Sequence, residues 1–285
     1  MLFRSLGRLA YAPGVDDDVE PDGPIGMIYG DLIEYLSRTH EVIPFAYDWR
    51  RPVEEEAQRL GRAVDAALNA RNASGQPVRI LAHSMGNWVT LEALRQMSIR
   101  NKGLPPKIQN IMLAAPDVDF DVFRRQILTM EAKPSLFTVF ISHDDEALAM
   151  SRRMWGNKPR LGAIDADAEP YRDQLSKEKI TIVDLTNVES DDRLGHGKFA
   201  QSPAVVRSIG ARLAAGQTLS DGHAGVGQKL GLATAGAVST VGAAAGVAVA
   251  TPFAIVDPNT RDNLGDHIQS VGEPLQSVGD HLRAR

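Results

Sequence analysis

Four short apolar runs, separated by helical stretches, restrict the possible folds of this chain more than any other feature. The apolar runs occupy residues 78–82, 108–114, 136–142 and 180–185. Helical patterns cover residues 87–97, 118–130, 146–155 and 204–215. Strands that are apolar on both faces and alternate with helices pair in parallel, because right-handed crossovers place helices over both faces of the sheet. We therefore predict the α/β class, with a mostly parallel sheet and helices on both faces.

The first 77 residues carry weaker signals. Residues 13–25 are rich in Pro, Gly and Asp, which indicates a solvated loop, and a short helix is expected over 31–36. Residues 42–47 have the composition of a strand, although Pro44 weakens this prediction because it lacks an N–H for strand pairing. Pro52 suits the first position of a further helix. The apolar face of that helix comprises Val53, Ala57, Leu60, Val64 and Leu68.

The character of the sequence changes near residue 217. Residues 230–256 contain no charged residue and are dominated by Ala and Gly, whereas 257–285 is polar. We therefore divide the chain into an α/β domain at 1–216 and a C-terminal, Ala/Gly-rich helical appendage at 217–285. The uncharged segment is long enough to cross a bilayer of about 30 Å, but Ala and Gly supply little transfer energy. Three alternatives stay open for it: membrane contact, a soluble self-associating hairpin, and a flexible tail.

Composition argues against several classes of function. The formal net charge of −5 disfavours nucleic acid as a partner, because basic surfaces bind its phosphate backbone. The chain contains no cysteine, which rules out disulfides, thiolate catalysis and zinc sites of the Cys type. We see no apolar run of signal-peptide length near the N-terminus and expect a cytoplasmic or inner-membrane-associated protein.

The most specific motif is Ala82-His83-Ser84-Met85-Gly86, which lies between a predicted strand and a predicted helix. It has the form of a nucleophile elbow with alanine in place of the first glycine. Small residues two positions before and after the serine let the chain turn tightly, so that the hydroxyl stands above the strand ends. The turn also aims the N–H of Met85 at a developing oxyanion. Ser84 is therefore the predicted nucleophile, and Met85 the predicted oxyanion donor.

A nucleophilic serine of this kind requires an acid and a histidine later in the chain. Asp145 follows the predicted strand 136–142, and we prefer it to the adjacent Asp144 as the acid. Asp117, which follows the strand one earlier, is the runner-up. An isolated Asp at such a place is also commonly a helix cap, so the assignment depends on the serine motif.

His196 is the predicted general base. It lies in a loop after the last predicted strand, with Gly195 and Gly197 on either side, and can reach across the strand ends. Four other histidines lie in unsuitable segments, namely His40, His223, His267 and His281. His83 occupies the variable elbow position, and His143 lies beside the acid loop. A solvent-exposed loop histidine is the alternative interpretation of His196.

These segments together resemble a bacterial α/β-hydrolase family of unknown function. The resemblance rests on LAHSMGNWVTLEALRQ, NIMLAAPDVDFDVFRRQI, ISHDDEALAMSRR and LGHGKFAQSP, and spans about residues 78–217. It implies an α/β-hydrolase fold, with the acid at Asp145 and the base at His196. A shorter stretch, YGDLIEYLSRTHEVIPFAYDWRRP at about 29–52, resembles lecithin:cholesterol acyltransferase-like lipases.

One part of the hydrolase pattern is missing. Such enzymes take a second oxyanion donor from a loop after an early strand, which lies in the sheet beside the strand that carries the serine. No such strand or motif precedes Asp31, unless 25–29 stands in for the strand. Losing one oxyanion donor typically slows the reaction about 10²- to 10³-fold. We therefore expect that this central strand is absent and that the hydrolase domain is N-terminally incomplete.

The sequence predicts a serine esterase that acts through an acyl-enzyme, without a metal or organic cofactor. Residues 29–52 and the uncharged segment favour lipid or acyl esters as substrates, with a membrane surface or self-association through 230–256 as a possible contact. Two alternatives stay open: a catalytically weak or inactive binding module at a membrane, and transfer of the acyl group to an alcohol. We expect Trp88 and Trp155 to be packing residues rather than pocket walls.

Overall fold

The structure is a computed structural model that describes residues 20–133, 136–178, 180–190, 192–214 and 228–229. Its centre is a parallel sheet whose strands lie in the order of the sequence. The strands are β1 (Val78–His83), β2 (Ile108–Ala114), β3 (Phe137–Ile141), β4 (Thr181–Asp184) and the two-residue β5 (Gln228–Lys229). The predicted α/β class and the four predicted strands of the domain are confirmed.

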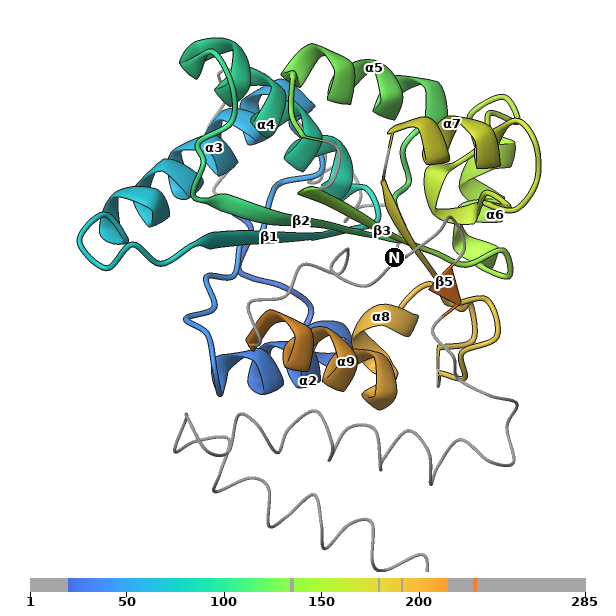
Figure 1. Cartoon of the computed structure of the whole chain (residues 1–285). Coiled ribbons are helices and arrows are strands. Elements are labelled where there is room, and N and C mark those ends of the chain that lie inside the picture. The colour runs from blue at the N-terminus through green and yellow to red at the C-terminus, as the bar shows by residue number, and fades with distance from the viewer. Residues whose placement is uncertain (1–19, 134–135, 179, 191, 215–227, 230–285) are drawn as a thin grey trace, which may run out of the picture.

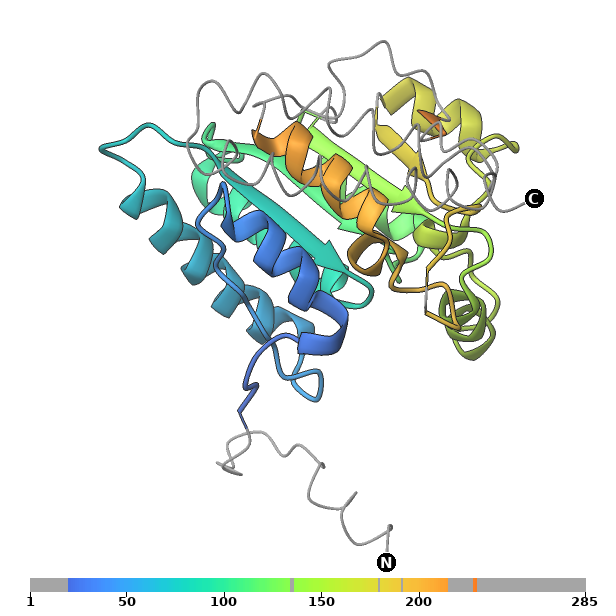
Figure 2. The same ribbon diagram turned by 90° about the horizontal axis from the view of Figure 1, so that it is seen from below.

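Helices cover both faces of the sheet, as Figures 1 and 2 show. One face is covered by α3 (Val53–Ala70), α4 (Gly86–Asn101) and α5 (Phe120–Met130). The opposite face is covered by α2 (Gly26–Ser37), α8 (Lys198–Gln201) and α9 (Pro203–Ala214). Two further helices, α6 (Glu146–Met154) and α7 (Tyr171–Glu178), lie between β3 and β4 in the chain.

The alternation of side chains along the inner strands produces two hydrophobic cores. Ile111 and Leu113 of β2 pack into the core beneath α3, α4 and α5. Met112 and Ala114 point to the other face and pack with residues of α2 and α9. Every residue of β3 is buried, as expected for a strand covered on both faces. Because successive side chains point to opposite faces, a strand with apolar residues at consecutive positions supplies both cores at once.

The N-terminal part departs from the sequence prediction in two places. Residues 42–47 form no strand, because they pair with no neighbouring strand. Pro44 also lacks the backbone N–H that such pairing would need. The first described helix begins at Gly26 rather than at residue 31, so residues 26–29 are helical and do not replace a strand. No strand occurs between residues 20 and 77, and β1 pairs with β2 alone among the described strands. The expected absence of the early central strand therefore holds for this range.

The crossover from β3 to β4 contains structure that the sequence did not reveal. A 3₁₀ turn at Leu161–Ala163 lies against the ends of the two central strands, where Gly162 N–H donates to the carbonyl of Pro116 and Ser142 N–H donates to that of Gly162. Helix α7 follows after a short series of turns. Only Leu175 of α7 is buried, so its sequence lacks the broad apolar stripe by which helices are recognised.

Most of the C-terminal segment lies outside the described residues, including 230–256, for which membrane contact, a self-associating hairpin and a flexible tail are the three open alternatives. Its described part, β5, pairs in parallel with β4 and extends the sheet. Among the helices that the structure describes, none is both long enough and apolar enough to span a bilayer.

Candidate active site

Ser84 lies at the sharp turn between β1 and α4, at the carboxyl ends of the strands. Its backbone is in the left-handed region, with φ of 53°, which is strained for a residue with a side chain. Hydrogen bonds hold the turn: Ser84 N–H donates to the carbonyl of Ala114, and the Asn87 side-chain amide donates to the carbonyls of Ser84 and Ala114. Strain that the surrounding structure maintains in this way is typical of functional residues.

His196 and Asp145 come together as the sequence predicts. The Nδ1 atom of His196 lies 2.7 Å from Oδ2 of Asp145, whose side chain is fully buried. The other carboxylate oxygen of Asp145 accepts the N–H of Leu148 and so caps α6. Because Nδ1–H donates to the carboxylate, Nε2 of the neutral ring is left as an acceptor.

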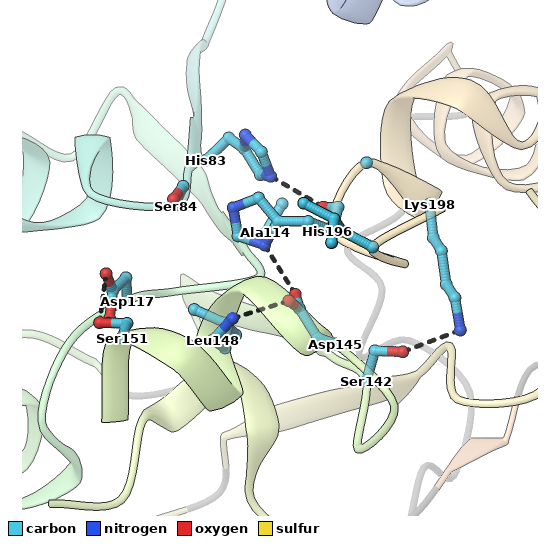
Figure 3. A network of polar contacts seen from close by, with 12 residues as sticks. His83, Ser84, Ala114, Asp117, Ser142, Asp145, Leu148, Ser151, His196 and Lys198 are labelled. Carbon is cyan, nitrogen blue, oxygen red and sulfur yellow. Dashed lines mark hydrogen bonds and ion pairs between the residues drawn. The ribbon is translucent and has the colours of Figure 1, made fainter. Parts of the chain in front are cut away.

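The ring of His196 lies between Asp145 and Ser84, with its second nitrogen on the side of the serine (Figure 3). Within the described residues no hydrogen bond joins the Ser84 hydroxyl to this nitrogen. Such contacts are often long in unliganded enzymes and shorten when substrate binds. The arrangement thus has the order serine, imidazole, carboxylate, which general-base activation of a hydroxyl requires.

The two other acid candidates are engaged elsewhere. Both carboxylate oxygens of Asp144 lie 2.7 Å from the ammonium of Lys198, a buried side chain that also donates to Ser142 Oγ and to the carbonyls of Leu185 and Thr186. Asp117 accepts the hydroxyl of Ser151 and lies 3.3 Å from Nε of Arg160. Neither carboxylate contacts His196, so the geometry favours Asp145.

The loop that carries His196 is fixed by a residue that the sequence did not single out. One carboxylate oxygen of Asp192 accepts the N–H groups of His196 and Gly197, at 2.6 Å each, and the other accepts the N–H of Leu194. Burial opposes ionisation of Asp192, but these three backbone donors outweigh it and hold its pKa below the ordinary value. Gly195 has φ of 68°, which glycine adopts without strain.

His83, which the sequence places at the variable elbow position, also contacts the His196 loop. Its Nε2 lies 3.0 Å from the carbonyl oxygen of His196, and its Nδ1 lies 2.7 Å from the hydroxyl of Tyr29. A carbonyl only accepts, so Nε2 carries the proton and Nδ1 accepts from Tyr29. Burial, followed by repulsion from the nearby His196, lowers the pKa of His83 to about 3. No local pattern in the sequence could reveal this bond, because the three residues lie far apart in the chain.

Met85, the predicted oxyanion donor, lies at the N-terminal end of α4. It is the residue that precedes α4, and N–H groups at a helix N-terminus have no partner within their own helix. The positive end of the helix dipole adds to the attraction for a negative charge there. A second donor from a loop after an early strand has no counterpart in residues 20–77, since no strand forms in this range. The described ranges hold no group of three or more His, Asp or Glu side chains arranged as metal ligands.

Comparisons with known proteins identify the family of this chain. Its residues 45–212, more than half of the chain, match the family described as "Alpha/beta hydrolase of unknown function (DUF900)". No curated protein and no solved structure matches the chain. The matched range contains Ser84, Asp145 and His196, the three residues that the fold gathers at the carboxyl ends of its strands. The chain therefore belongs to this family of α/β hydrolases.

Proposed function

We propose that the protein hydrolyses carboxylic esters through an acyl-enzyme on Ser84. The observation that carries this proposal is the position of His196, whose Nδ1 is bound to the buried Asp145 while its other nitrogen lies on the side of the strained Ser84. Family membership supports hydrolysis in general, and this geometry supports a serine mechanism in particular.

In the first half of the reaction, His196 Nε2 takes the proton of the Ser84 hydroxyl as the oxygen bonds to the ester carbonyl carbon. The carbonyl oxygen becomes negative and accepts a hydrogen bond from the N–H of Met85. The proton then passes from His196 to the departing alcohol, which leaves Ser84 acylated. Throughout, Asp145 holds the imidazole orientation and stabilises its charged form.

In the second half, water gives a proton to His196 and attacks the acyl carbon. The tetrahedral intermediate collapses, the proton returns to the Ser84 oxygen, and the carboxylic acid is released. An alcohol in place of water would yield a new ester, so the same residues also support acyl transfer. A preference for lipid or acyl esters remains part of the proposal, and it rests on the sequence of 29–52 and 230–256.

A second candidate function is a hydrolase-fold binding module with little or no turnover. The observation that favours it is the lack of a strand between residues 20 and 77, so the usual source of a second oxyanion donor has no counterpart in that range. By itself this deficit slows catalysis about 10²- to 10³-fold, which reduces activity without abolishing it. Labelling of Ser84 separates the two candidates, because only an activated serine reacts with an electrophilic phosphorus.

The test is intact-mass analysis after treatment with a fluorophosphonate probe. We expect one adduct on the wild-type chain, none on Ser84→Ala, and labelling about 100-fold slower or more on His196→Ala. His143→Ala is the matched control, because His143 is exposed and follows the same strand as Asp145 without contacting His196. A folded wild-type chain that takes no label would refute the serine mechanism and leave the binding module.

A further inference from the structure

All three tryptophans of the chain line one cavity beside the elbow. The cavity has a volume of about 590 Å³ and includes Met85, the residue after Ser84, in its wall. We call it the tryptophan cleft and define it by Trp49, Trp88, Trp155 and Met85. Its size lies within the range of sites for small molecules, about 300–1,000 Å³. Trp155, predicted as a packing residue, forms a wall of this cleft, and Trp88 both packs on the core and lines it.

Two of the three indoles are exposed to solvent. Trp49 is 68% exposed and Trp155 is 63% exposed, and they come from segments more than 100 residues apart. Large aromatic side chains are usually buried, since each contributes 150–250 Å² of surface that water solvates poorly. Two exposed indoles at the mouth of one cavity therefore indicate a surface that a ligand covers.

The walls are held in fixed positions. Trp49 follows Asp48, whose buried carboxylate accepts two hydrogen bonds from the guanidinium of Arg50, so the loop on both sides of Trp49 is anchored. Trp88 Nε1–H donates to the carbonyl of Asp117, at 2.6 Å. The carboxylate of Asp117 in turn accepts Ser151 Oγ, on the last turn of α6 just before Trp155. Asp117, the rejected acid candidate, thus organises this cleft.

Charged side chains also line the cleft, and most of them already have partners. Asp117 pairs with Arg160, Glu56 pairs with Arg59 from outside the cleft, and Asp119 caps α5. Among the described residues, the side chains of three further groups on the cleft wall have no hydrogen-bond or ion-pair partner. These are Arg125, Lys158 and Asp121. The cleft therefore combines flat apolar walls with unpaired charges of both signs.

We propose that the tryptophan cleft binds an aromatic ring system of the ester substrate, with polar substituents on its edge. An aromatic ring offers its faces to the indoles, and such pairs gain more than the area they bury. A hydroxyl group on the ring edge can donate to Asp121, and a hydroxyl or carboxylate group can accept from Arg125 or Lys158. Within this cleft a long alkyl chain fits less well, because it would desolvate those charges and give them no hydrogen bond in return. The cleft is therefore assigned to the aromatic part of the ester and not to an acyl chain.

This proposal rests on the proposed function for the position of the ester at Ser84, but its test does not depend on turnover. Isothermal titration calorimetry on the full-length chain compares the binding of 2-naphthoate with that of decanoate. Both are carboxylates, but the first carries a flat ring system and the second an alkyl chain. We expect 2-naphthoate to bind at least 5-fold more tightly. Trp49→Leu and Trp155→Leu keep apolar volume but lose the flat face, and each should weaken 2-naphthoate about 2- to 12-fold while leaving decanoate unchanged.

Met27→Leu is the matched control, because Met27 is an exposed apolar residue of α2, on the opposite face of the sheet. It should bind both carboxylates as the wild-type chain does. Equal affinity for the two carboxylates, or tighter binding of decanoate, overturns the proposal, as does 2-naphthoate binding that survives both tryptophan substitutions. If Ser84 takes no fluorophosphonate but 2-naphthoate binding depends on the indoles, the esterase proposal fails and the cleft proposal stands.

Discussion

The imidazole of His83 donates a hydrogen bond from Nε2 to the backbone carbonyl of His196, at 3.0 Å. This contact joins the residue before Ser84, the predicted nucleophile, to the predicted base, although the two lie 113 positions apart. The rings of His83 and His196 also lie close together, with centroids 4.5 Å apart. This hydrogen bond thus holds the elbow and the histidine loop together, and it involves neither the Ser84 hydroxyl nor the His196 ring.

Breaking this bond should slow the activation of Ser84. His83→Phe removes the donor and should reduce the rate of fluorophosphonate labelling about 2- to 10-fold, since one net hydrogen bond contributes about 0.5–1.5 kcal/mol. In His83→Gln the side-chain amide can occupy the place of Nε2, and labelling should stay within about 2-fold of the wild type. Equal rates for the Phe and Gln variants would contradict a positioning role for His83.

His83 should also make the stability of the fold depend on pH. Burial, followed by the nearby His196, lowers its pKa to about 3 in the folded chain, whereas the unfolded imidazole titrates near 6.5. Between these values the unfolded state binds more protons, so the free energy of unfolding falls as pH drops from 6.5 towards 3. The contribution of this group reaches about 1.4 kcal/mol per pH unit.

Urea unfolding of the wild-type chain and of His83→Gln at pH 7, 6, 5 and 4 measures this contribution. The wild type should lose stability relative to the variant at each step below pH 6.5. The comparison cancels other titrating groups that the two chains share. A difference in free energy that stays constant from pH 7 to pH 4 would show that His83 is not held neutral by the fold.

Three Asp→Asn substitutions should separate the acid candidates. Asp145→Asn removes the partner of His196 Nδ1 and should lower labelling of Ser84 by as much as about 10⁴-fold, the loss known for the corresponding change in a serine triad. Asp144→Asn and Asp117→Asn should retain labelling within about 10-fold, because those carboxylates bind Lys198, Ser151 and Arg160 instead. If Asp145→Asn were labelled rapidly and Asp117→Asn were not labelled, the role of the acid would pass to Asp117.

Gly162 should tolerate no side chain, even though its own φ is ordinary. A Cβ there would lie 2.6 Å from the carbonyl carbon of Ala115 and 2.7 Å from the nitrogen of Pro116, both backbone atoms that cannot rotate away. We expect Gly162→Ala to reduce the free energy of unfolding by about 1–3 kcal/mol, the usual cost of overpacking. Thermal and urea unfolding measure this loss.

Gly61 provides the matched control for that substitution. It lies within α3, and a Cβ there would meet no atom within 4 Å apart from its chain neighbours and the backbone of its own helix. Gly61→Ala should raise the free energy of unfolding by about 0.5–1 kcal/mol, since alanine loses less backbone entropy than glycine in a helix. If the two variants changed stability alike, the close approach at Gly162 would not be the cause.

The sequence by itself determined the class of the fold and the chemical types at the site. Apolar runs buried on both faces can only form the inside of a layered sheet, and β2 and β3 do so. The elbow motif and the two loop residues Asp145 and His196 follow strands, and the carboxyl ends of parallel strands meet at one edge. Periodicity and strand order are local or nearly local properties, so a single sequence reveals them.

Only the tertiary structure decided which side chains meet across long separations. The bond from His83 to His196, the clamp of Asp192 on the histidine loop and the gathering of Trp49, Trp88 and Trp155 leave no periodic trace in the sequence. Residues 42–47 have the composition of a strand but do not form one. A segment of this composition forms a strand only beside a partner strand with free N–H and C=O groups. Local propensity states what a segment can form, and the packing of distant segments selects what it does form.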